Sequence, residues 1–252
     1  MSENLYLSDD ILSAIHLPES VMIAGEEHLS ACCLVGMKAE PLVNLQTGAV
    51  VGHEFLSLLP SGVCSESFFR DQPATVLMEL FMLQLLLSTR LTSGYRFFNL
   101  PVRVLLRPRL CEVLYSSNLT GIMIEIQDPA SLPRLSLMQL SRLRHHLHSF
   151  RQAGVRIYVD DVIPGLIPEL SAMALPLSGL KVSRELFQSQ SQSQSQCHDL
   201  LAWYALTETE GETGRFLVAE GIETPEQSLL AALAGFTHGQ GWLWPTKRWQ
   251  FV

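Results

Sequence analysis

The sequence predicts an α/β fold, a modified TIM (β/α)8 barrel with an antiparallel first strand. Apolar strand-like runs alternate with amphipathic helical stretches nearly to the end of the chain, a pattern typical of βα units around a parallel sheet. Acidic residues follow several of these runs, as expected where strand ends converge on one mouth of a barrel. With 252 residues and 47% hydrophobic composition, the chain is long enough for one barrel and short for two ordinary domains.

Eight strands and six helices are expected from the periodicity of the apolar residues. The strands lie at about 34–44, 50–58, 95–100, 121–127, 155–160, 178–183, 215–220 and 237–242. The helices lie at about 73–91, 101–116, 135–152, 168–174, 197–208 and 225–234. We expect residues 1–30 to form an N-terminal extension that packs on the barrel, and residues 31–252 to form the barrel domain.

The connection between the first two strands is too short for a crossover helix. Only Gln46-Thr47-Gly48-Ala49 separates them, so they must pair antiparallel as a hairpin. Later in the chain, Gln188 to Gln196 is a strict Gln/Ser alternation with no apolar residue to bury, which predicts a surface loop after the sixth strand.

Polar residues at the strand ends are the most informative feature of the chain. Short apolar runs end in acid or amide at Glu54, Asn99, Glu125, Asp160, Asp161, Glu220 and Glu223. Burying an unpaired carboxylate costs several kcal/mol or forces it to take up a proton. Acids gathered at one mouth therefore need a cation or a basic partner, and hard oxygen donors favour Mg²⁺, Mn²⁺ or Ca²⁺.

Any single acid of this set has a simpler explanation, because exposed strand ends and helix N-caps are common places for Asp and Glu. The neighbours Asp160 and Asp161 are different, since two adjacent acids directly after an apolar strand repel each other. Lys181, at the end of the sixth strand, is a candidate source of compensating charge.

Composition excludes some classes of function. The formal net charge is −8 and no Lys/Arg-rich run occurs, so we expect no DNA-binding groove. The N-terminus lacks the pattern of a signal peptide and the apolar runs fall short of a membrane span, so we expect a cytoplasmic protein with no membrane association. An acidic protein can still bind another protein, and a homodimer is left open.

Taken in order, the motifs resemble those of the EAL-domain family, bacterial phosphodiesterases that hydrolyse cyclic di-GMP to linear pGpG. The resemblance runs from about Glu40 to Pro245. The motifs that carry it are Glu54-Phe55-Leu56, Phe98-Asn99-Leu100, Val159-Asp160-Asp161, Leu180-Lys181-Val182, Ala219-Glu220-Gly221-Ile222-Glu223-Thr224-Pro225-Glu226-Gln227 and Gln240-Gly241-Trp242-Leu243.

The resemblance implies a two-metal site that uses Mg²⁺ or Mn²⁺, with Ca²⁺ as a candidate inhibitor. The implied metal ligands are Glu54, Asn99, Glu125, Asp160 and Asp161. Glu220 and Lys181 are the implied catalytic residues, with Lys181 near the attacking water, and Gln240 and Glu223 support the site.

Departures from the family pattern concern the substrate side. An arginine expected to bind a substrate phosphate is Leu58 here, and a glutamine expected to contact guanine is Glu40. Losing a charged phosphate contact costs about 1.5–3 kcal/mol, so the resemblance implies weak or no binding of cyclic di-GMP. Asp128 stands where a glutamate is expected.

The loop after Asp161 also departs from the family pattern, which has Phe-Gly-Thr where this chain has Val162-Ile163-Pro164. A β-branched residue followed by proline restricts the backbone where the loop would position metal and substrate.

Two functions remain open from the sequence, with a nucleotide receptor that binds without hydrolysis as a third and narrower possibility. The first is cyclic di-GMP hydrolysis with reduced or absent activity. The second is a catalytically inactive regulator that binds a protein partner, such as a transcription or motility factor.

Overall fold

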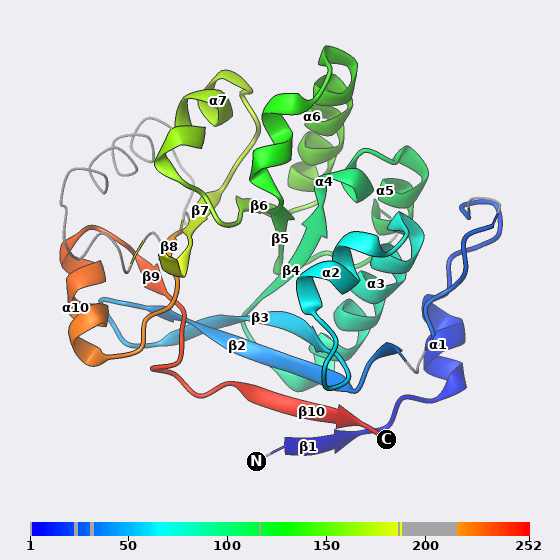
Figure 1. The fold of residues 1–252 in the computed structure, drawn as a ribbon, viewed down its shortest axis with the longest axis horizontal. Helices are drawn as coiled ribbons and strands as arrows, with labels where there is room; N and C mark the ends of the chain where they lie inside the picture. The colour runs from blue at the N-terminus through cyan, green and yellow to red at the C-terminus, as the bar shows by residue number, and fades with distance from the viewer. Residues whose placement is uncertain (1, 23–24, 31–32, 116, 186, 188–215) are drawn as a thin grey trace.

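The computed structural model describes the chain except residues 1, 23–24, 31–32, 116, 186 and 188–215. Both the expected loop at Gln188 to Gln196 and the expected helix at 197–208 lie outside the described residues. In what is described, strands β2 to β9 form a ring with helices on its outer side (Figure 1).

A closed barrel of eight strands confirms the predicted fold class. Each strand from β3 to β8 pairs in parallel with the next along the chain, and β2 closes the ring by pairing antiparallel with both β3 and β9. The strands are β2 (Gly36–Asn44), β3 (Val50–Leu58), β4 (Tyr95–Pro101), β5 (Ile122–Gln127), β6 (Arg156–Val159), β7 (Gly179–Val182), β8 (Phe216–Ala219) and β9 (His238–Gly239).

Four expected helices are present: α3 (Ala74–Leu91), α6 (Leu137–Gln152), α7 (Ile167–Ala172) and α10 (Pro225–Leu233). The single helix expected at 101–116 is wrong, because the chain forms α4 (Val102–Leu105) and α5 (Pro108–Tyr115) instead. Pro108 has no N–H to continue a helix and disfavours helical geometry at Arg107, so the first helix ends and a second begins.

Two strands and two helices were not expected. Strand β10 (Lys247–Phe251) pairs antiparallel with the free part of β2, and β1 (Ser2–Leu5) adds to β10 in parallel, which brings both termini together (Figure 1). The helices are α1 (Asp9–Ile15) and α2 (Ser65–Asp71). Because α2 buries none of its residues, its sequence needs no apolar stripe, and apolar periodicity does not predict it.

The core has two parts. A small cluster fills the barrel interior, formed by Leu42, Phe97, Met123, Tyr158, Phe216 and Val218. A much larger cluster lies between the outer face of the strands and the helices. Because successive strand residues point to opposite faces, this arrangement sends alternate side chains of each strand toward the barrel axis.

Helix α3 is an exception to the expectation that the apolar runs are too short to span a membrane. It is the one described helix long and apolar enough to cross a membrane, but 72% of it is buried inside the protein. That burial fits a core helix, which packs its apolar surface against the barrel.

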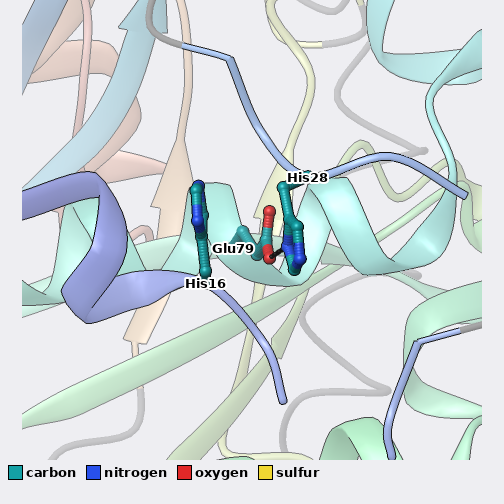
Figure 2. A group of neighbouring side chains, drawn as sticks. All are labelled: His16, His28 and Glu79. Carbon is teal, nitrogen blue, oxygen red and sulfur yellow. Dashed lines mark hydrogen bonds and ion pairs between the residues drawn. The ribbon is translucent and has the colours of Figure 1, made fainter. Parts of the chain in front are cut away.

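Glu79 of α3 fastens the N-terminal segment to the barrel. This fully buried carboxylate accepts hydrogen bonds from the backbone N–H groups of Leu17, at 2.7 Å, and Leu29, at 2.6 Å. Nδ1 of His28 lies 2.5 Å from Oε1 of Glu79, and His16 stacks on His28 with ring centroids 4.4 Å apart (Figure 2).

The arrangement of these side chains does not suit a metal ion. The lone pairs of imidazole nitrogens lie in the ring plane, and two rings only 20° from parallel do not direct them at one point. The oxygens of Glu79 are already used by the backbone. The cluster therefore holds the N-terminal segment in place.

We predict that Glu79→Ala lowers the free energy of unfolding by about 3 kcal/mol or more, because it leaves buried N–H groups without an acceptor. Glu79→Gln should lower the free energy of unfolding by about half as much, since its side chain keeps one acceptor oxygen. Urea unfolding followed by tryptophan fluorescence measures both, with the exposed Thr89→Ala on the same helix as control. A Glu79→Ala variant within about 0.5 kcal/mol of wild type would contradict this role.

Candidate metal and catalytic site

The structure brings most of the predicted site residues together at the carboxyl ends of the barrel strands. Glu54, Asn99, Glu125 and Lys181 lie within β3, β4, β5 and β7. Asp160, Glu220 and Gln240 each follow directly after the last residue of β6, β8 and β9. Strand register aligns them, because Asn99 pairs with Glu125 and Glu54 with Glu40.

Lys181 lies at the centre of this cluster and is only 1% exposed. Its Nζ is near four carboxylates, at 2.6 Å from Glu220, 3.0 Å from Glu54, 3.3 Å from Glu125 and 3.6 Å from Asp160. An ammonium group has three protons and one positive charge. It therefore cannot satisfy four ionised carboxylates, and the cluster would carry an excess of negative charge if all four were ionised.

Glu54 is the best satisfied of these acids. Its Oε1 accepts a hydrogen bond from Nδ2 of Asn99 at 2.7 Å, and its Oε2 accepts from Nε2 of Gln240 at 2.6 Å. Burial would raise the pKa of Glu54, but the charge of Lys181 and the hydrogen bonds from its neighbours lower it to about 2. Glu54 is therefore held as an ionised, fixed carboxylate.

The pKa values of the other buried acids shift in the opposite direction, upward. Burial raises the pKa of Glu220 to about 8 and the pKa of Asp160 to about 6, although the charge of Lys181 opposes both shifts. Burial and the charge of Glu54 raise the pKa of Glu125 well above its ordinary value. Without additional cations, the site accordingly holds protons at pH values where exposed carboxylates are ionised.

Two buried oxygen atoms at this mouth have no hydrogen-bond partner within the described chain: Oδ1 of Asn99 and Oε1 of Glu125. Asp160, Asp161 and Glu220 also place carboxylate oxygens within 4.8 Å of one another. Unpartnered buried oxygens beside surplus carboxylates suit hard divalent cations, which take oxygen ligands. The donor set thus fits Mg²⁺ or Mn²⁺.

The remaining predicted residues lie at the rim. Asp128 is exposed after β5 and adopts a positive φ of 58°, while Glu223 pairs with Arg184 away from Lys181. Leu58 ends β3 opposite Gly36, and Glu40 accepts a hydrogen bond from Gln240 at 3.3 Å.

Sequence reasoning did not assign the rim residues Lys38 and Arg184 to the site, and it placed Trp242 only within a family motif. Arg184 lies over the Trp242 ring, 4.7 Å from its centroid, and both line a cavity of about 190 Å³ that also contacts Glu54 and Glu220. Lys38 pairs with Glu40 on β2. A period-two pattern would have placed Lys38 beside Glu40, but it does not identify which strand face points into the mouth.

Comparison with known proteins shows the family of this chain. The family model described as "EAL domain" matches residues 31–246. The chain belongs to the EAL domain family. No match was found among curated proteins.

Solved structures with the same fold share 16–20% of their sequence with this chain. BlrP1 of Klebsiella pneumoniae, in a calcium and cyclic di-GMP complex, is 20% identical with a TM-score of 0.68, covering 93% of this chain and 62% of that one. The FimX EAL domain of Pseudomonas aeruginosa bound to cyclic di-GMP is 16% identical with a TM-score of 0.66, covering 84% and 90%.

A third structure, the cGMP-bound EAL enzyme Bd1971, is 20% identical with a TM-score of 0.58 and covers 82% of this chain. This chain spans 60% of the Bd1971 chain.

We predict that the metal-free protein loses stability as pH rises from about 5 to 9. Glu220 and Asp160 have pKa values raised to about 8 and about 6 from ordinary values of 4.5 and 3.8, so the folded state binds more protons than the unfolded state in this window. The contribution of these two groups to stability is fully present below their ordinary pKa values. It is lost as pH rises through their pKa values in the folded state. Mn²⁺ should restore stability, and its effect on Tm should grow with pH.

Thermal unfolding with and without about 1 mM Mn²⁺, from pH 5 to 9, measures this effect. Asp160→Asn should remove most of the Mn²⁺ response, while Asp71→Asn on the exposed surface should keep it. The same Tm with and without Mn²⁺ at every pH would show that these oxygens hold no ion.

Proposed function

We propose that the protein hydrolyses cyclic di-GMP to linear pGpG with slow turnover, using divalent cations held at the barrel mouth. Membership of the EAL domain family supports this function, as do related structures in complex with cyclic di-GMP. The single observation that carries the proposal is the surplus of buried carboxylates around Lys181, beside unpartnered oxygens of Asn99 and Glu125.

The oxygens of Glu54, Asn99, Glu125, Asp160 and Asp161 would hold the cations. When bound, divalent cations offset the negative charge that develops on a phosphodiester during in-line displacement. The protein itself fixes the ligands, because Asn99 and Gln240 hold both oxygens of Glu54. This preorganisation limits the rearrangement needed at the moment of reaction.

Glu220 and Lys181 are suited to proton handling. Oε1 of Glu220 lies 2.6 Å from Nζ of Lys181, and the pKa of Glu220 is raised to about 8 by burial. A carboxylate whose pKa lies near the working pH both accepts and returns a proton efficiently. We assign Glu220 the acceptance of a proton from the attacking water, with Lys181 orienting that carboxylate.

The loop after β6 supports slow turnover. Asp161 adopts a positive φ of 49°, and the backbone N–H of Val162 donates to the carbonyl of Lys181 at 3.0 Å. Val162 is fully buried, whereas Ile163 is 49% exposed beside the mouth. The loop is thus anchored in the core at Val162, and its outer part is restricted by Ile163 and Pro164.

A regulator that binds a protein partner is the second candidate. The observation that favours it is an apolar face of α10, where Leu229, Leu230 and Leu233 are 61%, 53% and 75% exposed. These positions share one side of the helix, and clustered exposed leucines are a feature of interaction surfaces.

Turnover separates the two functions. With Mn²⁺ and cyclic di-GMP, we expect wild type to form pGpG slowly and Glu54→Ala to form none, because Glu54 connects Asn99, Gln240 and Lys181. Chromatography of the products measures both rates. The exposed Glu112→Ala on α5 is the matched control and should keep the wild-type rate. No pGpG from wild type, together with normal folding, would favour the regulator.

We further predict that Ile163→Gly with Pro164→Thr raises kcat about tenfold or more, since misplacing reacting groups by about 1 Å can cost a hundredfold. The Mn²⁺ dependence of Tm should stay unchanged. Val162 is left in place because a larger residue at a fully buried position would overpack the core. An unchanged or lower kcat would show that this loop does not limit the rate.

A further inference from the structure

Lys38 lies on β2 two residues before Glu40, at the rim of the barrel. The β2–β3 register pairs Glu40 with Glu54 and Lys38 with Leu56, one step further from the barrel centre. Because alternate strand residues share a face, Lys38 lies on the same side as Glu40 and the predicted metal ligand Glu54. Its side chain is 25% exposed, so it is partly accessible to solvent.

An ion pair holds the Lys38 amine at the site. Nζ of Lys38 lies 2.5 Å from Oε1 of Glu40, and Lys38 lines a cavity of about 150 Å³ that reaches Asn99 and Gln127. Glu40 is fixed in turn, because its Oε2 accepts a hydrogen bond from Gln240, which also donates to Glu54. A hydrogen-bonded chain therefore leads from Lys38 to the predicted metal site.

The neighbouring strand adds a second positive charge. Arg248 of β10 pairs directly with Lys38 in the sheet, and residues opposite each other on antiparallel strands share a face with Cβ atoms about 5 Å apart. Like charges in such a pair are destabilising unless an anion lies between or beside them. Among these three residues, Glu40 offsets one of the two positive charges.

Two other cations of the described mouth are more fully engaged than Lys38, which has one carboxylate partner and Arg248 opposite it in the sheet. Lys181 is buried among four carboxylates, and Arg184 pairs with Glu223 and covers Trp242. Leu58 is apolar and stands diagonally across the β2–β3 pair from Lys38, at a spacing of about 7–8 Å that a lysine side chain can span.

We propose that Lys38 binds a phosphate group of the nucleotide substrate, with Glu40 positioning its amine and Arg248 strengthening the local positive charge. This inference rests on the proposed function. Lys38 thereby supplies, from the opposite strand, a positive charge that Leu58 does not. The pair Lys38 and Glu40 acts as a unit, and Glu40 links phosphate binding to the orientation of Glu54 through Gln240.

Binding of cyclic di-GMP by calorimetry tests the proposal, with Ca²⁺ as the divalent cation to limit hydrolysis. Lys38→Ala should weaken binding about ten- to a hundredfold, the effect of losing a charged hydrogen bond, and should reduce the salt dependence of affinity. Lys38→Arg should stay within a few fold of wild type. Arg90→Ala, at the last turn of α3, removes one exposed positive charge elsewhere and should have no effect.

A rescue experiment separates loss of charge from loss of structure. Leu58→Arg added to Lys38→Ala should restore most of the affinity, because it returns a cation to the same side of the mouth. Leu233→Arg, which adds the same charge on exposed α10, should not. In hydrolysis with Mn²⁺, Lys38→Ala should raise KM more than it lowers kcat, and its Tm response to Mn²⁺ should match wild type.

The outcomes distinguish this inference from the function on which it rests. If wild type binds cyclic di-GMP and Lys38→Ala binds equally well, Lys38 is not a phosphate ligand while the proposed function stands. If wild type neither binds nor hydrolyses cyclic di-GMP with Ca²⁺ or Mn²⁺, both the proposed function and the inference are wrong.

Discussion

The contacts of Lys181 with buried carboxylates are the constraint on which the site depends. One ammonium group lies within 3.6 Å of acids from four different strands or strand ends. Breaking a buried charge pair by removing one partner leaves an uncompensated charge, so neither the lysine nor its acids can be changed independently. The same surplus of negative charge that makes the metal-free site costly makes it suitable for divalent cations. Stability without metal and affinity for metal are therefore opposed.

The antiparallel hairpin of β2 and β3 gives this barrel mouth its particular rim. Because β2 runs opposite to the other barrel strands, its N-terminal half extends past the mouth beside β3 and receives β10 on its outer edge. Lys38 and Glu40 lie on this half of β2, and Leu58 is the last residue of β3 beside it. A regular barrel would end each strand at the mouth, whereas here the hairpin continues past it. Gln240 connects this hairpin to the predicted metal ligands, because it donates to both Glu40 and Glu54.

Much of the fold follows from the sequence because apolar runs and short connections restrict the topology. The eight barrel strands were predicted, and so was the hairpin, from a four-residue connection at Gln46–Ala49. Strand β1 was missed because Ser2–Leu5 has a single apolar residue, and β10 was missed because its alternation is short, with only Trp249 and Phe251 as apolar members. The break before Pro108 was missed because the apolar periodicity continues across it, although proline disfavours a continuous helix there. Contacts such as Glu79 with Leu17 join residues 62 positions apart, which local patterns do not encode.

The gathering of Glu54, Asn99, Glu125, Asp160 and Glu220 around Lys181 was predictable in outline, because strand ends of a barrel converge. The proposed roles of Lys38 and Arg248 depend on register between strands far apart in sequence.

Manganese anomalous scattering from crystals grown with Mn²⁺ tests the central claim, that the barrel mouth binds divalent cations, most directly. We expect anomalous peaks about 2.0–2.3 Å from oxygens of Glu54, Asn99, Glu125 and Asp160. Crystals with no anomalous peak at this mouth, and with Lys181 still contacting all four carboxylates, would contradict it.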